Sequence, residues 1–183
     1  MEKYNIFIES NTLIWTRKRI ILLLIFSIFI ILGIEYLLVG ELKENLLNKV
    51  LFYLLLLFFL LGLINVFFKE ELKGELSGEI IFSNEKIQIA DKTFILDDIR
   101  LIKFSGFDYV DQPIIYNFPD GLFSNGVNNK LVIILHSGAV ISTRFQRKYP
   151  NEMRKISKQL AYYYHSKKII KQNYLDTLNE RIF

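Results

Sequence analysis

The chain has 183 residues, of which 51% are hydrophobic and 23% charged, with no cysteine and a formal net charge of +4. This apolar content excludes an intrinsically disordered chain, and the lack of cysteine excludes disulfides, thiolate catalysis and cysteine-ligated metal sites. The apolar residues are also clustered, because residues 20–40 contain one charged side chain, Glu35, and residues 50–68 contain none. A simple soluble globule does not have this distribution.

The two apolar stretches predict a helical hairpin that spans a membrane. At about 1.5 Å per residue, either stretch is long enough as a helix to cross a hydrocarbon core of about 30 Å. We expect transmembrane helices at 20–40 and 50–68, joined by a short extracytoplasmic loop at 41–49. A cleaved signal peptide is the alternative for the first stretch, but its length and the lack of small residues at its end argue against cleavage.

The lysine and arginine counts beside the two stretches predict their orientation. Residues 1–19 carry four basic side chains and residues 69–88 carry three, whereas the loop at 41–49 carries two. Because basic flanks stay on the cytoplasmic side, we expect residues 1–19 to form a cytoplasmic N-terminal segment and both termini to be cytoplasmic. The location that follows is the cell (inner or plasma) membrane, crossed twice.

Glu35 is a candidate titratable residue within the membrane. An ionisable group inside a bilayer is costly and often marks an ion or proton path. However, Glu35 lies five residues from the outer end of its stretch, and neither stretch contains a second acidic or basic residue to pair with it. At this depth the carboxylate can reach the headgroups or be protonated, so the position favours a structural role.

From Lys69 onward the sequence has the period of β-strands. Residues 72–82 alternate apolar or small side chains with polar ones, and shorter strands fit 85–90, 92–96 and 99–104. Strands at 130–136 and 139–145, separated by Ser-Gly, form the clearest hairpin of the chain. We therefore expect an antiparallel meander.

The tract 106–129 interrupts these strands. It contains closely spaced proline, Asp-Gly and Asn-Gly turn signals, yet it has too many apolar side chains for a plain solvated loop. One or two short strands would account for them, and contact with the membrane surface or with a partner is the alternative. An enzyme would need a polar cluster in this tract.

The C-terminal part predicts an amphipathic helix. Pro150 suits a first helical turn, and Met153, Ile156, Leu160 and Tyr163 then recur at helical spacing. Their common face can pack on a sheet, so we expect a cytoplasmic β domain with a closing helix at 69–165. Residues 166–183 continue the pattern less regularly and predict a helical C-terminal tail.

This arrangement resembles the bacterial pleckstrin-homology-like (PH-like) membrane proteins, including the YcxB-like group. Leu96-Asp97-Asp98-Ile99 corresponds to a Trp-Ser-Asp-Ile-like element of that group, and Ile141-Ser142-Thr143-Arg144-Phe145 to an Ile-Pro-Lys-Arg-like tract. The resemblance implies a membrane-anchored α+β fold: a two-helix transmembrane hairpin followed by an antiparallel PH-like domain with a C-terminal amphipathic helix. It implies binding of lipids, peptides or neighbouring proteins, and no catalytic residues.

A basic tract at the junction of the last strand and the helix is the candidate contact with anionic lipid or a partner. Each basic side chain beside an anionic leaflet contributes about 1 kcal/mol of attraction. The alternative is that the last three residues of the set form the solvated face of the helix. The candidate contact residues are Arg144, Arg147, Lys148, Arg154, Lys155 and Lys158.

Motifs for catalysis, metals and nucleotides are absent from the sequence. His136 and His165 lack metal-ligand spacing, and no glycine-rich phosphate loop occurs. The modest net charge, without a recognition motif, argues against nucleic acid as a partner. We expect no enzymatic activity, no cofactor and no metal.

Two functions remain open at this point. The first is a non-enzymatic integral membrane protein whose cytoplasmic PH-like module binds a protein or anionic lipid, in membrane assembly or regulation. Its partners would be the lipid bilayer and either another protein or further copies of the chain. The alternative is a small transporter or channel subunit, formed by oligomerised hairpins in which Glu35 titrates.

Overall fold

The structure is a computed structural model that describes residues 2–12, 15–39, 46–114 and 121–178. They form two compact units. The first, here called the β domain, comprises Met1–Asn11, Leu72–Gln112 and Ser124–Phe183, and the second, here called the hairpin unit, comprises Thr12–Glu71 and Pro113–Phe123. The chain therefore leaves the β domain near its N-terminus and returns to it after the hairpin.

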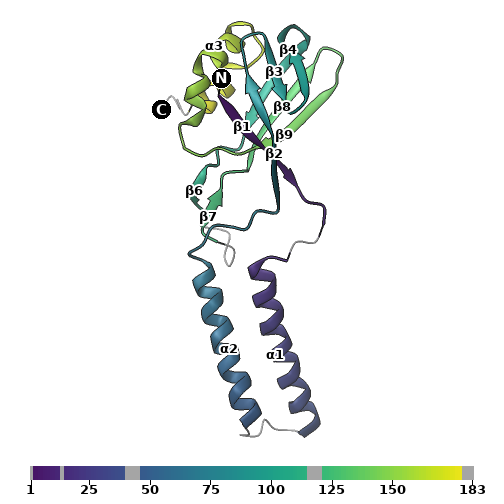
Figure 1. Ribbon diagram of the computed structural model, residues 1–183, viewed down its shortest axis with the longest axis vertical. Helices are drawn as coiled ribbons and strands as arrows, with labels where there is room; N and C mark the ends of the chain where they lie inside the picture. The colour runs from purple at the N-terminus through teal and green to yellow at the C-terminus, as the bar shows by residue number, and fades with distance from the viewer. Residues whose placement is uncertain (1, 13–14, 40–45, 115–120, 179–183) are drawn as a thin grey trace. The chain divides into compact units, whose positions relative to one another are not determined.

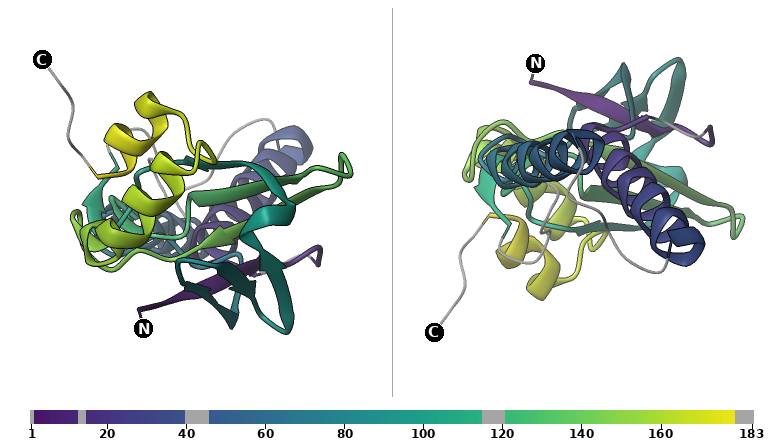
Figure 2. Two further views of the ribbon diagram at one scale, coloured as in Figure 1. Left: turned by 90° about the horizontal axis from the view of Figure 1, so that it is seen from above. Right: turned by 90° about the horizontal axis from the view of Figure 1, so that it is seen from below.

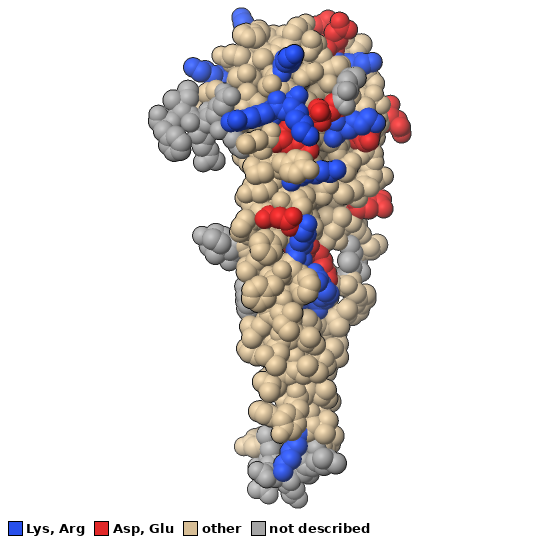
Figure 3. Space-filling view, turned by 60° about the vertical axis from the view of Figure 1, so that its left-hand side comes forward, with Lys and Arg blue, Asp and Glu red and all other residues tan. Residues whose placement is uncertain are grey.

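The hairpin unit contains two long apolar helices, α1 (Arg17–Val39) and α2 (Leu46–Asn65). Both are long and apolar enough to cross a membrane, by length and composition. Only 6% of the most apolar window of either helix is buried, and on the face shown in Figure 3 the surface over the helices is almost entirely uncharged. The expected second span, 50–68, differs in its bounds, because α2 begins at Leu46 and ends at Asn65.

The β domain contains a seven-stranded sheet in the order β4-β3-β2-β1-β9-β8-β5, with antiparallel pairing between neighbours (Figure 1). The expected antiparallel strands are confirmed, but they do not form one meander: β2, β3 and β4 pair in succession, whereas β5 pairs with β8 at the opposite edge of the sheet. A short 3-10 turn, η1 (Leu96–Asp98), connects β4 to β5. The strands other than β1 are β2 (Gly74–Phe82), β3 (Lys86–Ile89), β4 (Lys92–Ile95), β5 (Ile99–Ser105), β8 (Asn129–Leu135) and β9 (Val140–Phe145).

Strand β1 (Lys3–Glu9) lies between β2 and β9. Its register pairs Lys3 with Ile81 and Glu9 with Gly74 on one side, and Ile6 with Phe145 on the other. The expectation that residues 1–19 form a segment apart from the β domain, which would begin at 69, is therefore wrong. The strand pairs with partners that lie beyond the whole hairpin in sequence, which local periodicity does not reveal.

One face of the sheet is covered by the C-terminal elements (Figure 2). A 3-10 turn, η2 (Glu152–Ile156), leads into α3 (Ser157–His165), so the expected amphipathic helix is confirmed, although its first turn is 3-10. Leu160 and Tyr163 of α3 are buried in the core. The core strands contribute mainly Ile and Phe side chains, including Ile80, Phe82, Ile87, Ile102, Phe104, Leu131, Ile133 and Phe145.

The described part of the C-terminal tail, 166–178, belongs to the β domain and covers the outer edge of β5. Helix α4 (Lys171–Thr177) brings Asn173 to that edge, where its Oδ1 accepts the Phe104 N–H at 2.9 Å and its Nδ2 donates to the Phe104 carbonyl at 2.6 Å. The Ile102 N–H donates to the Lys168 carbonyl at 2.7 Å. Capping an edge strand in this way blocks unwanted pairing with another chain.

The tract 106–129 contains a second sheet of two short strands, β6 (Val110–Pro113) and β7 (Phe123–Asn125). The expected short strands are thus confirmed. Part of the tract, 115–120, lies outside the described residues.

The role of β1 can be tested through Tyr4. Its side chain is 1% exposed, its ring packs edge-on against Phe82 and Phe145 with centroids 5.7 and 5.8 Å away, and its hydroxyl donates to the Glu152 carbonyl at 3.1 Å. We expect Tyr4→Ala to destabilise the β domain by about 3–5 kcal/mol, as for other buried aromatics. This loss of stability is measured by the hydrogen-exchange rates of the β2 and β9 amides in the full chain, held in detergent micelles.

Ile8→Ala is the matched control, because Ile8 lies on the same strand but is 49% exposed. We expect this surface substitution to lower the free energy of unfolding by about 0.5 kcal/mol or less. Equal exchange rates in the two variants would contradict a central position for β1.

Candidate functional site

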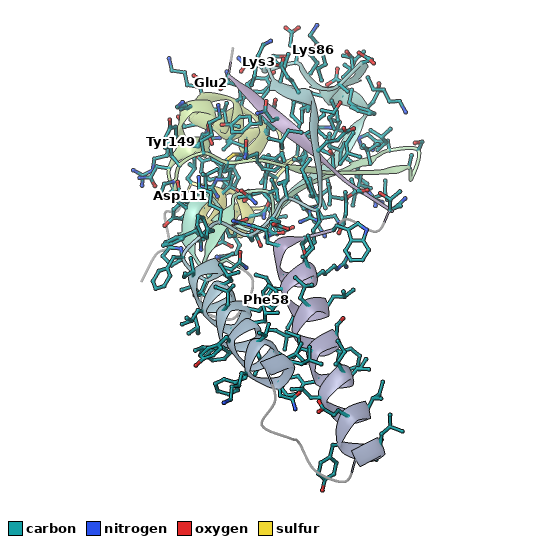
Figure 4. The ribbon with its side chains drawn as sticks, turned by 60° about the horizontal axis from the view of Figure 1, so that its bottom comes forward. Glu2, Lys3, Phe58, Lys86, Asp111 and Tyr149 are labelled. Atoms are coloured by element: carbon teal, nitrogen blue, oxygen red, sulfur yellow. The ribbon has the colours of Figure 1, made fainter. Side chains whose placement is uncertain are left out.

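The candidate site is a polar cavity of about 200 Å³ in the β domain, here called the polar pocket. Three separate segments build it: the start of β1, the residues that follow β9, and η2. Figure 4 shows Glu2 and Lys3 at the start of β1, with Tyr149 on the same side of the β domain. The lining residues are Glu2, Lys3, Tyr4, Asn5, Gln146, Lys148, Tyr149, Glu152 and Lys155.

Charges of both signs face the polar pocket. Lys3 pairs with Glu79 at 2.6 Å, and Lys155 lies 3.8 Å from Glu2 with its ammonium 5.7 Å from the centre of the exposed Tyr149 ring. The exposed Lys148 side chain has no ion pair within the described part of the chain. The pocket therefore offers ammonium groups, carboxylates and an aromatic face to a polar ligand.

Glu152 links the segments that form the pocket floor. Its carboxylate accepts the Lys148 N–H, and its carbonyl accepts the Tyr4 hydroxyl. Burial, and then the nearby Glu152 carboxylate, raise the pKa of Tyr4, so this hydroxyl remains a donor. The first turn of η2 is thereby tied to β1.

Arg147 is a buried arginine in the chain between β9 and η2. Its side chain is 1% exposed, one Nη donates to the Pro150 carbonyl, and its Nε and other Nη have no hydrogen-bond partner among the described residues. Burial lowers the pKa of Arg147, and Tyr4, Glu152 and Asp108 act against this shift. A side chain in this position cannot reach a lipid headgroup or a partner at the surface.

The backbone of Arg147 also fixes the tract 106–129. Its N–H donates to the Gly126 carbonyl at 2.9 Å, and its carbonyl accepts the Val110 N–H at 3.0 Å. Gly126 has φ of +70°, and a Cβ there would lie 2.3 Å from the Arg147 carbonyl oxygen. Only glycine fits this close approach without a backbone shift.

The polar side chains of the tract 106–129 hold its own backbone. The Asp108 carboxylate accepts the Ser124 hydroxyl at 2.7 Å and the Asn128 N–H at 3.1 Å. The Asn129 amide donates to the carbonyls of Asp108 and Gly126 at 2.9 and 2.8 Å. These polar residues therefore stabilise the conformation of the tract itself.

The six predicted contact residues do not share one surface. Lys148 and Lys155 line the polar pocket, and Arg147 is buried. Arg144 lies 4.9 Å from the centre of the Phe7 ring and pairs with Glu9 at 3.1 Å, while the exposed Arg154 donates to the Leu178 carbonyl at 3.3 Å. Lys158 is exposed on α3. Lys3, which sequence reasoning used only for orientation, joins the pocket because β1 is part of the sheet.

Glu35 has a polar partner that the sequence reasoning missed, because only charged residues were considered. The Asn48 side-chain amide, near the start of α2, donates to Glu35 Oε1 at 3.0 Å. This hydrogen bond connects the two helices of the hairpin. His136 and His165 are both exposed, and no group of three or more potential metal ligands occurs in the described ranges.

A structural role for Arg147 predicts a large effect of its removal. Arg147→Ala leaves a cavity in place of a buried side chain and removes the hydrogen bond to the Pro150 carbonyl, so we expect a loss of about 3 kcal/mol from the free energy of unfolding of the β domain. Lys158→Ala, at an exposed site nearby in sequence, should change it by about 0.5 kcal/mol or less. Hydrogen-exchange rates of the β9 amides compare the stability of the two variants. An equally small effect of the two substitutions would refute the structural role of Arg147.

The contact between Glu35 and Asn48 predicts that the charge of Glu35 is dispensable. Glu35→Gln keeps an oxygen that accepts from Asn48, so its hairpin should resist thermal unfolding in micelles like the wild type. Glu35→Leu and Asn48→Leu should each weaken the hairpin, and the double variant should be no worse than either single one. Additive losses would show that the two side chains act independently.

Comparison with known proteins does not assign a family. No family model, no curated protein and no solved structure matches this chain. What the protein does is therefore inferred from its own residues and their geometry.

Proposed function

We propose that this chain is a non-enzymatic integral membrane protein with two spans, which holds a PH-like β domain at the cytoplasmic face, where the polar pocket binds a partner protein. The observation that carries the proposal is the central place of β1. The β domain is assembled from chain on both sides of the apolar hairpin, and so it is tethered to the hairpin by two connections.

Membrane insertion is supported by the exposure of α1 and α2. Large apolar side chains on both helices are exposed, among them Phe26, Leu37, Phe52 and Phe59. Soluble proteins rarely expose an apolar surface of this extent, whereas a bilayer covers it. Helices satisfy their backbone hydrogen bonds internally, as the hydrocarbon core requires.

The sheet supports a topology in which both ends of the hairpin lie on the same side. Because β1 pairs with β2 and β9, the residues before α1 and after α2 must meet in one folded unit. The segment that leaves β1 and the segment that enters β2 also lie side by side, since the Ser10 N–H donates to the Lys73 carbonyl at 3.0 Å. The distribution of lysine and arginine then favours the cytoplasmic side.

A protein partner fits the polar pocket better than a lipid surface. Attraction to an anionic leaflet follows the net positive charge near it. In the polar pocket, however, the carboxylates of Glu2, Glu152 and the nearby Glu79 equal the three lysines in number, so the formal charges balance. Mixed charges of this kind give specificity for a complementary polar surface. The exposed Tyr149 ring adds the amphipathic contact that protein interfaces favour.

The PH-like assignment is supported by the antiparallel sheet followed by a C-terminal helix that packs on it. In this chain the hairpin follows the first strand of the domain, rather than preceding the domain as expected from the sequence. Insertion between two adjacent strands leaves their pairing intact.

The proposed topology is tested by thiol labelling, because the chain contains no cysteine. We expect Lys43→Cys, between the two helices in sequence, to react with a membrane-impermeant maleimide added to intact cells. Lys148→Cys, in the β domain, should react only after the cells are opened. Labelling of Lys148→Cys in intact cells would overturn the cytoplasmic placement.

Partner binding is tested by placing a photo-crosslinking amino acid at Tyr149, in the polar pocket, in the full chain within cells. We expect a discrete protein adduct that is lost when Lys148→Glu and Lys155→Glu are added. Tyr162, 44% exposed on α3 and outside the pocket lining, is the control position. Adducts with lipid alone, or the same adduct from both positions, would contradict the proposal.

A further inference from the structure

The segment that follows α2, residues 66–71, begins where the apolar helix ends. Helix α2 has 20 residues, and at about 1.5 Å per residue it is about 30 Å long, which matches the thickness of the hydrocarbon core. With α2 across the bilayer, the residues directly after Asn65 fall in the headgroup layer. Phe67 and Phe68 belong to this segment and are 75% and 49% exposed.

The backbone of this segment is hydrogen-bonded although it is not helical. The N–H groups of residues 66–68 donate to the carbonyls three residues earlier. The Lys69 carbonyl accepts from Arg17 Nη2 at 3.1 Å, and the Glu70 N–H donates to the Phe123 carbonyl at 2.8 Å. Irregular backbone at the boundary of the hydrocarbon core needs such partners, because unpaired N–H and C=O groups are costly there.

Arg17, the first residue of α1, holds the segment from the other helix. Its Nε pairs with the Glu71 carboxylate at 2.6 Å, and the same carboxylate accepts the Arg17 N–H. Its guanidinium lies 4.9 Å from the centre of the Phe68 ring. Trp15 precedes α1 by two residues and is 61% exposed. Aromatic side chains therefore flank the hairpin where α1 begins and where α2 ends.

The tract 106–129 is fastened to the same segment. Its part Pro113–Phe123 belongs to the hairpin unit. The Leu122 N–H donates to the Val66 carbonyl at 2.8 Å, and the Leu122 carbonyl accepts the Ile114 N–H at 2.6 Å. Backbone hydrogen bonds thus hold this part of the tract beside the end of α2, about 50 residues away in sequence.

Gly121 permits this close approach. A Cβ at this position would overlap the Phe68 carbonyl oxygen and the backbone of Lys69. Backbone atoms cannot move aside as the end of a flexible side chain can, so a larger residue at position 121 would push the tract away from the segment.

We propose that Trp15, residues 66–71, Ile114 and residues 121–123 form a lipid-contacting surface, here called the interfacial collar, in the headgroup layer where α1 begins and α2 ends. The inference rests on the proposed membrane insertion. Aromatic rings are enriched at this level of a bilayer, where their apolar body and their polar edge are both accommodated. Because Arg17 and Glu71 neutralise each other, the collar recognises the interface itself and needs no anionic lipid.

The first test uses Trp15, the single tryptophan of the chain. The full chain is reconstituted in phosphatidylcholine vesicles whose acyl chains carry bromine, a quencher of fluorescence, either near the headgroup or near the chain end. We expect the shallow bromine to quench Trp15 more strongly than the deep bromine does. Stronger quenching by the deep bromine, or none by either, would overturn the inference.

The second test moves the tryptophan into the tract. In a chain with Trp15→Phe and Phe123→Trp, we again expect stronger quenching by the shallow bromine. Adding Gly121→Ala should release the tract and abolish most of this quenching. Gly33→Ala is the matched control, because nothing lies within 4 Å of its Cβ position, and it should leave the quenching unchanged.

An unquenched tryptophan at position 123 would overturn the placement of the tract, and quenching that survives Gly121→Ala would overturn its fastening to the segment after α2. If the Gly121→Ala chain does not reconstitute, the quenching at position 123 decides alone.

A third position reports membrane insertion separately. Phe29 lies near the middle of α1 and is 56% exposed, so in a chain with Trp15→Phe and Phe29→Trp the deep bromine should quench more strongly. Deep quenching at position 29 without quenching at positions 15 and 123 overturns the interfacial collar alone. No quenching at any of the three positions overturns the proposed function as well.

Discussion

Backbone pairing of β1 with β2 and β9 is the interaction on which the rest of the molecule depends. Within the part of the chain that the structure describes, β1 joins the group β2, β3 and β4 to the group β9, β8 and β5. Without it the sheet would separate into two pieces, each with an open edge that favours aggregation. The entropy cost of closing the chain across the hairpin grows only slowly with loop length. A short strand with good partners can therefore hold the domain together.

The same pairing creates the polar pocket. Strand β1 brings Lys3 and Tyr4 beside Lys148 and Glu152, which lie far away in sequence. The Tyr4 hydroxyl bonds to the Glu152 carbonyl, so the core of the sheet and the floor of the pocket share a side chain. Arg147 in turn connects this region to the tract 106–129 through its backbone. The sheet and the candidate site thus both depend on β1, which precedes the hairpin in sequence.

Much of the fold could be predicted from the sequence, because the signals are local. Two long apolar stretches indicate the helices, and alternation in residues such as Ile87 and Ile89 indicates strands. Strand β1 was missed because its alternation is brief: a bulge between Asn5 and Phe7 buries both Ile6 and Phe7. The burial of Arg147 was also beyond sequence reasoning, since arginine is almost never fully buried and only tertiary contacts reveal the exception.

The pairing of β1 with β2 is tested most directly by an engineered disulfide between these two strands, which lie on either side of the helical hairpin in sequence. Asn5 of β1 and Glu79 of β2 are register partners, and directly opposed strand residues are close enough for a disulfide. In membranes that contain the full chain, which has no cysteine of its own, oxidation should link Asn5→Cys to Glu79→Cys. It should leave Asn5→Cys with Glu75→Cys unlinked, because Glu75 pairs with Ile8. No disulfide in the first pair, or equal linkage in both, would contradict a sheet built across the hairpin.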